Sequence, residues 1–384
     1  MKKRLYGVSS LLLLMAAVFV VPEDANALSA FARKEGVPCG TCHYRINRLN
    51  QVGLNYMRQG FTFNVGDTKA PEPKLEETGK YFSVLANIDV YKKNQGADYT
   101  SSVSNVTLYG GGALGSDFSF LLETTVAPSD AQEVADAYLQ YTPGNDDKYA
   151  FIRAGRMLPM LFQAENTWEF ANDRSTAFVR DRRIGVAAGY NFGKAWAELA
   201  ALTPGGGSTN NKVDFVANAQ YIFTPTGSSL GAYYWNGNVY LNATDPYYVL
   251  NPGTGTIDRI PGTPATSDRF SRYGVVGQYN QIDNLLLSAG YSQGKGDSSA
   301  GGDQKIQGLF GQVEYNLFDR ASVLLNVVGE KPDTSASNVR TTTYTLAGYY
   351  WLAKYASVDL RYVYQALPDA RHDSQVKLRV RFMY

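Results

Sequence analysis

The chain ends on Lys377-Leu378-Arg379-Val380-Arg381-Phe382-Met383-Tyr384, the stretch that decides its fold. Apolar side chains at every second position lie on one side of an extended backbone, and the charged Lys377, Arg379 and Arg381 lie on the other. A period of two predicts a β-strand with one apolar and one polar face. A last strand that finishes on an aromatic residue is typical of barrels in the bacterial outer membrane.

An early segment repeats this alternation. Its polar face carries Ser83, Asn87 and Asp89, and its apolar face carries Phe82, Val84, Ala86, Ile88 and Val90. We count sixteen such segments from residue 80 to the end. They lie near 80–92, 100–112, 116–126, 131–142, 148–156, 183–192, 194–203, 211–224, 228–241, 269–280, 282–294, 304–316, 321–331, 339–351, 356–367 and 373–384.

The connections between these segments alternate in length. If the first strand rises from the periplasm, the even-numbered junctions are tight, at Gly115, 143–147, Gly193, 225–227, Gln281, 318–320 and Lys354. The odd-numbered junctions hold the long stretches, at 157–182, 204–210, 242–268, 295–303, 332–338 and 368–372, and only the short 128–130 breaks the rule. Outer-membrane barrels have short periplasmic turns and longer external loops. The alternation therefore returns both barrel ends to the periplasm.

Composition agrees with a barrel. The chain has 28 Tyr, 18 Phe and 37 Gly, with 44% hydrophobic residues, and no later stretch approaches the roughly twenty apolar residues of a spanning helix. Without such a helix, a chain can cross a bilayer only as a closed barrel, whose backbone groups pair between strands. A soluble β-sandwich with its apolar faces turned inward is the alternative, but it predicts no alternation of loop length. The net charge of +1 points to no nucleic-acid partner.

Cys39-Gly40-Thr41-Cys42-His43 holds the only two cysteines of the chain. This C-x-x-C-H pattern is the attachment site of a c-type haem. Cys39 and Cys42 would bond to the haem vinyl groups, and His43 would bind the iron as its proximal ligand. A disulfide or a redox-active cysteine pair is the alternative, although neither requires His43. We therefore predict one covalent haem c.

The first 27 residues have the form of a cleaved export signal. Lys2, Lys3 and Arg4 precede an apolar stretch at 11–21, and Ala25-Asn26-Ala27 fits the cleavage site. The apolar stretch is shorter than the roughly twenty residues that span a membrane. We predict export to the periplasm and insertion among the lipids of the outer membrane.

Between the signal and the barrel we predict a small helical haem c-binding segment at 28–65 and a polar linker at 66–79. Ile46, Leu49, Val52 and Tyr56 recur at helical spacing, so a helix is expected within 44–58, ended by Gly60. The apolar band of a barrel is about 25 Å tall. A haem outside the barrel would be too distant from an external donor, so we expect this segment to plug the lumen.

Met57 is our candidate for the distal ligand of the iron, because it follows the motif closely on the expected helix. Met157 and Met160 are alternatives in the long 157–182 connection, while His372 is expected to be a surface residue of an external loop. A thioether ligand raises the haem potential. We expect no catalytic residue beyond the haem ligands.

The N-terminal residues resemble a known family. Phe31-Ala32-Arg33, the C-x-x-C-H motif, Leu49-Asn50 and Gly53 are similar to the signature of the fused cytochrome-porins of the outer membrane. In that family a monohaem cytochrome c precedes a sixteen-stranded barrel. The family commonly has proline and phenylalanine where this chain has Arg48 and Val52.

The resemblance implies an electron conduit, an oxidoreductase without bond-making chemistry. It would take electrons from extracellular Fe(II), or another external donor, and pass them to a periplasmic c-type cytochrome. Two alternatives stay open: a conduit that runs electrons outward, and a solute or anion porin with a structural or regulatory haem. The porin alternative rests on six arginines, which would either attract anions or pair with haem propionates and with carboxylates such as Glu123 and Glu314. They are Arg153, Arg156, Arg174, Arg180, Arg182 and Arg183.

Overall fold

The computed structural model describes residues 30–45, 48–63, 81–94, 99–115, 117–128, 133–143, 148–159, 178, 182–203, 213–241, 247–250, 257–260, 266–298, 302–318, 320–333, 341–353, 356–366 and 372–383. The predicted export signal and the predicted linker lie outside these residues. No helix among the described residues has the length and the apolar character needed to cross a membrane.

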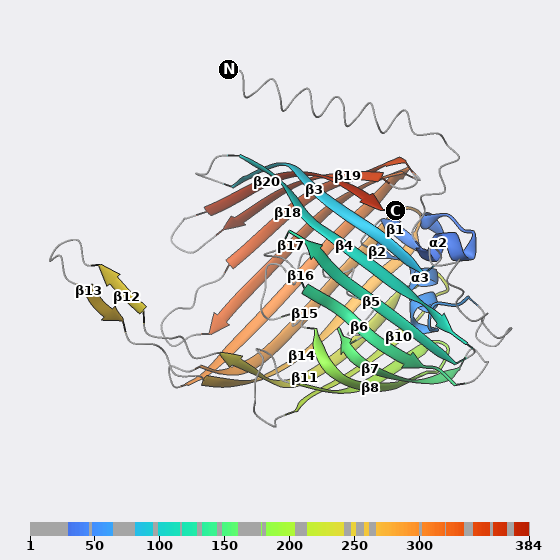
Figure 1. Cartoon of the computed structure of the whole chain (residues 1–384), viewed down its shortest axis with the longest axis horizontal. Helices are drawn as coiled ribbons and strands as arrows, with labels where there is room; N and C mark the ends of the chain where they lie inside the picture. Colours follow the sequence, from blue (N-terminus) through green and yellow to red (C-terminus); the bar gives the residue numbers. More distant parts are fainter. Residues whose placement is uncertain are drawn as a thin grey trace, which may run out of the picture.

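Sixteen antiparallel strands close into one barrel within the described residues, and this confirms the predicted all-β barrel (Figure 1). The last strand pairs with the first, which completes the closure. The strands are β3 (Phe82–Asn94), β4 (Thr100–Leu114), β5 (Phe118–Ala127), β6 (Glu133–Tyr141), β7 (Tyr149–Met157), β8 (Arg183–Asn191), β9 (Ala195–Leu202), β10 (Asp214–Ile222), β11 (Ser229–Leu241), β14 (Thr266–Ile282), β15 (Leu285–Ser298), β16 (Gly302–Phe318), β17 (Ala321–Asp333), β18 (Thr341–Ala353), β19 (Ala356–Ala366) and β20 (His372–Met383).

The apolar faces of the strands point outward. Leu199 and Phe215 expose 67% and 59% of their surface, whereas the polar side chains of Ser83, Asn87 and Asp89 are buried. A soluble sandwich would bury the apolar face instead. The orientation therefore excludes the sandwich and matches a barrel surrounded by lipid.

The two ends of the barrel differ. One end carries the tight turns, and we call it the short-turn end; the other carries the longest connections, and we call it the long-loop end. The turn between β14 and β15 lies at Asp283-Asn284 rather than at the predicted Gln281, because Asn284 adopts a positive φ of 62° that Asn tolerates well. Within 242–268 the structure adds a hairpin that the sequence pattern missed, made of β12 (Tyr247–Leu250) and β13 (Ile257–Ile260).

The N-terminal segment, residues 30–45 and 48–63, contains less helix than predicted. Residues 43–45 pair with residues 48–49 as two short antiparallel strands in place of the expected first helical turns, because Asn50 caps a helix that begins only at Gln51. Gly60, with a φ of 79°, follows the helix end as predicted. The elements are α2 (Ala30–Glu35), η1 (Cys39–Thr41), β1 (His43–Arg45), β2 (Arg48–Leu49) and α3 (Gln51–Arg58).

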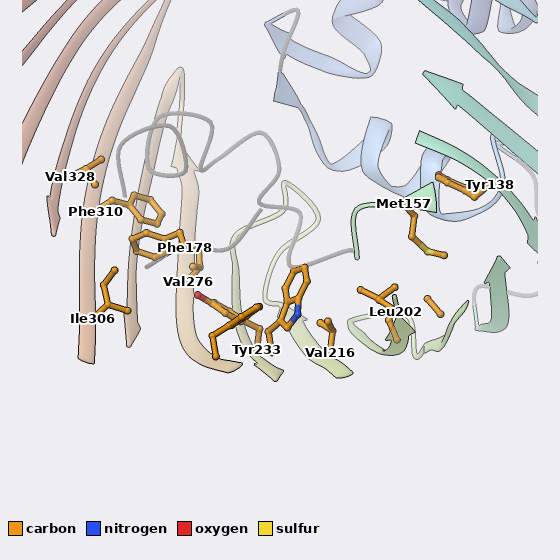
Figure 2. Close-up of a cluster of buried hydrophobic side chains, with 14 residues drawn as sticks. Tyr138, Met157, Phe178, Leu202, Val216, Tyr233, Val276, Ile306, Phe310 and Val328 are labelled. Carbon is orange, nitrogen blue, oxygen red and sulfur yellow. The ribbon is translucent and has the colours of Figure 1, made fainter. Parts of the chain in front are cut away.

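Part of the inner wall is apolar. A cluster of buried hydrophobic side chains runs along it from β6 to β17, and Phe178 of the long 157–182 connection joins it. Figure 2 shows Phe178 facing Phe310, whose ring centroid lies 5.4 Å away. Protein side chains therefore occupy this part of the lumen, where an open porin holds water.

Candidate haem site

The N-terminal segment packs against the inner wall at the short-turn end (Figure 1). The amide of Asn280, near the end of β14, donates to the Tyr44 hydroxyl at 3.1 Å. That hydroxyl donates in turn to the carbonyl of Thr226, in the turn between β10 and β11, at 3.4 Å. The C-x-x-C-H motif is thereby held beside the tight turns.

Arg48 joins the N-terminal segment to strands β14, β15 and β16 of the wall. Its guanidinium forms an ion pair with Glu314 of β16 at 2.7 Å, and the two side chains are 1% and 0% exposed. It also donates to Gln278 at 3.1 Å and to Ser288 at 3.2 Å. Charged groups this deeply buried depend on each other, because neither is stabilised by water.

Arg58, the last residue of α3, forms a second attachment. It donates to Gln220 of β10 at 2.9 Å, and its guanidinium carbon lies 4.3 Å from the ring centroid of Trp196. Its carbonyl accepts from Gln140 of β6 at 2.8 Å. Burial lowers the pKa of Arg58 to about 10. The two arginines therefore attach the segment to different parts of the barrel circumference.

Three glycines allow the segment to lie close to the wall. A Cβ at Gly111 of β4 would lie 2.7 Å from the Phe31 ring, one at Gly60 would lie 2.8 Å from Ser119 Oγ, and one at Gly227 would lie 2.7 Å from a Gln51 side-chain oxygen. Ordinary contacts of a Cβ atom are longer than this. The wall, at Gly111 and Gly227, and the segment, at Gly60, thus both lack a side chain where the two surfaces approach most closely.

Asn50 organises the C-x-x-C-H motif. Its side-chain oxygen accepts from the Gly53 N–H at 3.0 Å, which caps α3, and its amide donates to the carbonyl of Thr41 at 2.9 Å. Its backbone N–H donates to the Cys42 carbonyl at 2.9 Å. A Cβ at Gly53 would lie 2.2 Å from that same carbonyl oxygen, so only glycine fits there. These contacts give a physical reason for Asn50 and Gly53 at these two positions.

A cavity of about 230 Å³ lies between the motif and the barrel wall. Cys42, His43 and Met57 line it from the N-terminal segment. Leu85, Leu121 and Met383 line it from the wall, and Leu121 also packs against the apolar lumen cluster. Cys39 lies in η1, and its side chain is outside the described part of the structure.

Aromatic rings cover the cavity on the segment side. The ring of Phe31 stacks on that of Phe61 with centroids 5.0 Å apart, and Tyr56 contacts Phe63 at 4.7 Å. The Tyr56 hydroxyl donates to Glu35 at 2.9 Å. Burial, and next the charge of Glu35, raise the pKa of Tyr56 above its usual value of 10.0. The phenol therefore stays neutral.

Carboxylates of the wall close the cavity on its other side. Glu123 and Asp136 line it, and the Arg182 guanidinium lies between them, 3.4 Å from the first and 2.9 Å from the second. The Tyr109 hydroxyl donates to Glu123 at 3.1 Å. The other Asp136 oxygen accepts from the backbone N–H of Leu158 at 3.2 Å. Within the described residues, no three His, Cys, Asp or Glu side chains gather as a separate metal site.

The other ligand candidates are spread along the barrel. Met157 is fully buried in the lumen cluster beside Leu202, away from the cavity lining (Figure 2). His372 begins β20 at the long-loop end, where its ring stacks on Tyr364. Met160 lies outside the described residues. Met383 lines the cavity but was not among the predicted ligands. Its spacing of two residues from Arg381 already indicated that its side chain faces the lumen.

The arginines of the predicted basic cluster pair with carboxylates. Arg153 binds Glu198 at 2.7 Å, Arg156 binds Glu133 at 2.6 Å and Arg183 lies 3.6 Å from Asp214, in addition to the Arg182 contacts. Arg174 and Arg180 lie outside the described residues. Glu123 pairs with this cluster as predicted, whereas Glu314 pairs with Arg48. The four described arginines therefore do not form an unbalanced positive constriction.

The residues around the cavity fit a covalent haem. A thiol, an imidazole and two thioethers converge on one mostly apolar space, with carboxylates and an arginine at its edge. Haem proteins use these groups to bond, ligate and tune the cofactor.

No protein-family model matches the chain, and no curated protein matches it in sequence. Solved structures match its fold. A loop-deletion variant of OmpT, an outer membrane protein of Vibrio cholerae, aligns with a TM-score of 0.55 and 15% identity over 79% of this chain and 98% of its own. An anion-selective porin from Comamonas acidovorans gives 0.57 and 14% over 79% and 98%, and OmpF of Salmonella typhi gives 0.54 and 11% over 79% and 97%. The chain therefore has the sixteen-stranded, porin-like β-barrel fold of these outer-membrane proteins.

Proposed function

We propose that this protein is an electron conduit of the outer membrane, in which one haem c is held in the barrel lumen by the N-terminal segment. The observation that carries this proposal is the cavity shared by Cys42 and His43 of the motif and by the inner wall. A cytochrome segment that merely preceded a porin would need no buried contacts with the wall. Here Arg48 forms a buried ion pair with Glu314, and Arg58 forms a cation–π contact with Trp196.

Cys39 and Cys42 would bond the haem, and His43 would be its proximal ligand. Met57 is the thioether that the N-terminal segment itself brings to the cavity. Bound there, the haem would supply reversible one-electron transfer. Phe31 and Phe61 would exclude water from one side, and Arg182 would balance the negative charge of the wall carboxylates.

Electrons would enter from outside and leave at the periplasmic side. Bacterial barrels keep their short turns in the periplasm. We therefore assign the N-terminal segment to that side, within reach of a periplasmic c-type cytochrome. The apolar band is about 25 Å tall, so a haem inside the lumen shortens the distance to an external donor. Fe(II), which gives up one electron to become Fe(III), is the donor we favour from the sequence resemblance.

A porin is the second candidate, and the solved structures that share the fold favour it. They are outer-membrane proteins and channels, and one is described as anion-selective. Two observations weigh against a simple open pore. The N-terminal segment occupies the short-turn end, and the described arginines of the basic cluster pair with carboxylates.

The test uses the purified full-length protein in detergent. A haem stain after denaturing electrophoresis reports covalent haem, anaerobic stopped-flow mixing with Fe(II) reports its reduction, and planar bilayers report conductance. Rapid reduction coupled to a ferric cytochrome c, with little conductance, is the expected result, and a His43→Ala variant should lose the reduction. Haem that stays oxidised would exclude Fe(II) as the donor. Steady conductance without haem would establish the porin.

A further inference from the structure

We propose that Met383, the last residue of the barrel's final strand, is the distal ligand of the haem iron. This inference rests on the proposed function, because it requires the covalent haem. It differs from the sequence-based prediction, which favoured Met57. Two described thioethers line the cavity, one from the N-terminal segment and one from the wall, and the arrangement of the cavity distinguishes them.

Met57 approaches from the same side as His43. It lies one helical turn after Gly53 on α3, and Gly53 packs directly against the Cys42 carbonyl. Residues four apart share one face of a helix. The face of α3 that carries Met57 is therefore the face that rests on the motif. The two axial ligands of a haem must lie on opposite sides of the macrocycle, so a ligand from across the cavity suits His43 better.

Met383 comes from across the cavity. It pairs in register with Leu85 of β3, and both side chains line the cavity from the wall. Met383 follows Arg379 and Arg381 at every second position, so its side chain lies on the same lumen-facing side of β20. At the end of the strand this face therefore carries a thioether instead of a charged group. His43 of β1 and Met383 at the C-terminal end of β20 line the same cavity.

Other possible ligands on the wall are engaged or distant. Glu123 and Asp136 bind Arg182, and the Tyr109 hydroxyl donates to Glu123. His372 begins the same twelve-residue strand that Met383 ends, so it lies roughly 35 Å away at about 3.3 Å per residue. Leu85 and Leu121 make the wall around Met383 apolar, which suits a thioether more than a charged ligand.

A ligand from the wall has a structural consequence. The haem would be bonded to the N-terminal segment through the motif and to the barrel through Met383. The segment could then leave the lumen only by breaking the iron–sulfur bond as well as the Arg48 and Arg58 contacts. The cofactor would thus link the N-terminal segment to the final strand of the barrel.

The test compares Met383→Leu with the matched Met57→Leu in the full-length, haem-loaded protein. Leucine keeps the volume and removes the sulfur. A thioether on ferric haem gives a weak near-infrared charge-transfer band, and an open distal position binds carbon monoxide when the iron is ferrous. We expect Met383→Leu to lose the band, bind carbon monoxide and lower the midpoint potential, and Met57→Leu to keep all three wild-type properties.

A further variant separates ligation from folding. Met383→His should lose the band yet still block carbon monoxide, with the heat-modifiable migration of a folded barrel unchanged. Loss of the band in Met57→Leu alone, or its persistence in Met383→Leu, would overturn the assignment while leaving the conduit intact. Absence of the band from the haem-loaded wild type would also overturn the assignment of Met383 and leave the conduit intact. Absence of covalent haem from the wild type would instead overturn the proposed function.

Discussion

The Arg48–Glu314 ion pair allows a direct test of whether the N-terminal segment closes the lumen. Arg48→Ala removes the guanidinium that contacts Glu314, Gln278 and Ser288, and it leaves a carboxylate with no exposed surface beside an alanine. Removing one partner of a buried pair costs about 3–5 kcal/mol. Since about 1.4 kcal/mol changes an equilibrium tenfold, the undocked population should rise about one hundred- to four-thousand-fold.

Single-channel recording in planar bilayers measures that population as open events. Arg156→Ala is the matched control, because its pair with Glu133 is 32% and 62% exposed and should contribute about 0–1 kcal/mol at most. The double variant Arg48→Ala/Glu314→Ala removes both charges and should recover most of the closed state. Recordings of Arg48→Ala that match wild type and Arg156→Ala would refute the closing role of the segment.

Three further variants test the site and the barrel. Gly53→Ala would place a Cβ 2.2 Å from the Cys42 carbonyl oxygen and should lower the amount of covalent haem per barrel. Gly40→Ala, whose Cβ would meet no atom within 4 Å, should leave that amount unchanged, and equal haem contents in the two variants would contradict the prediction. Buried Tyr56 keeps a proton that an exposed tyrosine releases above pH 10.0, so the thermal stability of the protein should fall above that pH. Tyr56→Phe should reduce this fall, and identical pH profiles of variant and wild type would argue against the role of Tyr56. Leu199→Arg adds a charge to the outer face and should destabilise the barrel in lipid vesicles by about 2–4 kcal/mol, while an unchanged urea midpoint would mean that this face meets water.

The strands and their order could be predicted from the sequence because the signal is local. Alternation along β3 and β20 defines each strand, and loop length defines the direction in which it runs, without knowledge of distant partners. The same holds for the C-x-x-C-H motif, which is contiguous. Local pattern failed at 43–45 and 48–49, where Asn50 caps a helix that begins later than the hydrophobic spacing indicates, and at Gln281, where the positive φ of Asn284 moves the turn.

The sequence by itself therefore determined a sixteen-stranded barrel and the position of the C-x-x-C-H motif. Only the tertiary structure decided that Arg48 meets Glu314, 266 residues later, and that Met383 and His43 line one cavity. The physical reason is closure. The register of every strand pair and the pairing of β20 with β3 fix which inward-facing side chains meet across the lumen, and no local pattern encodes the sum of those registers.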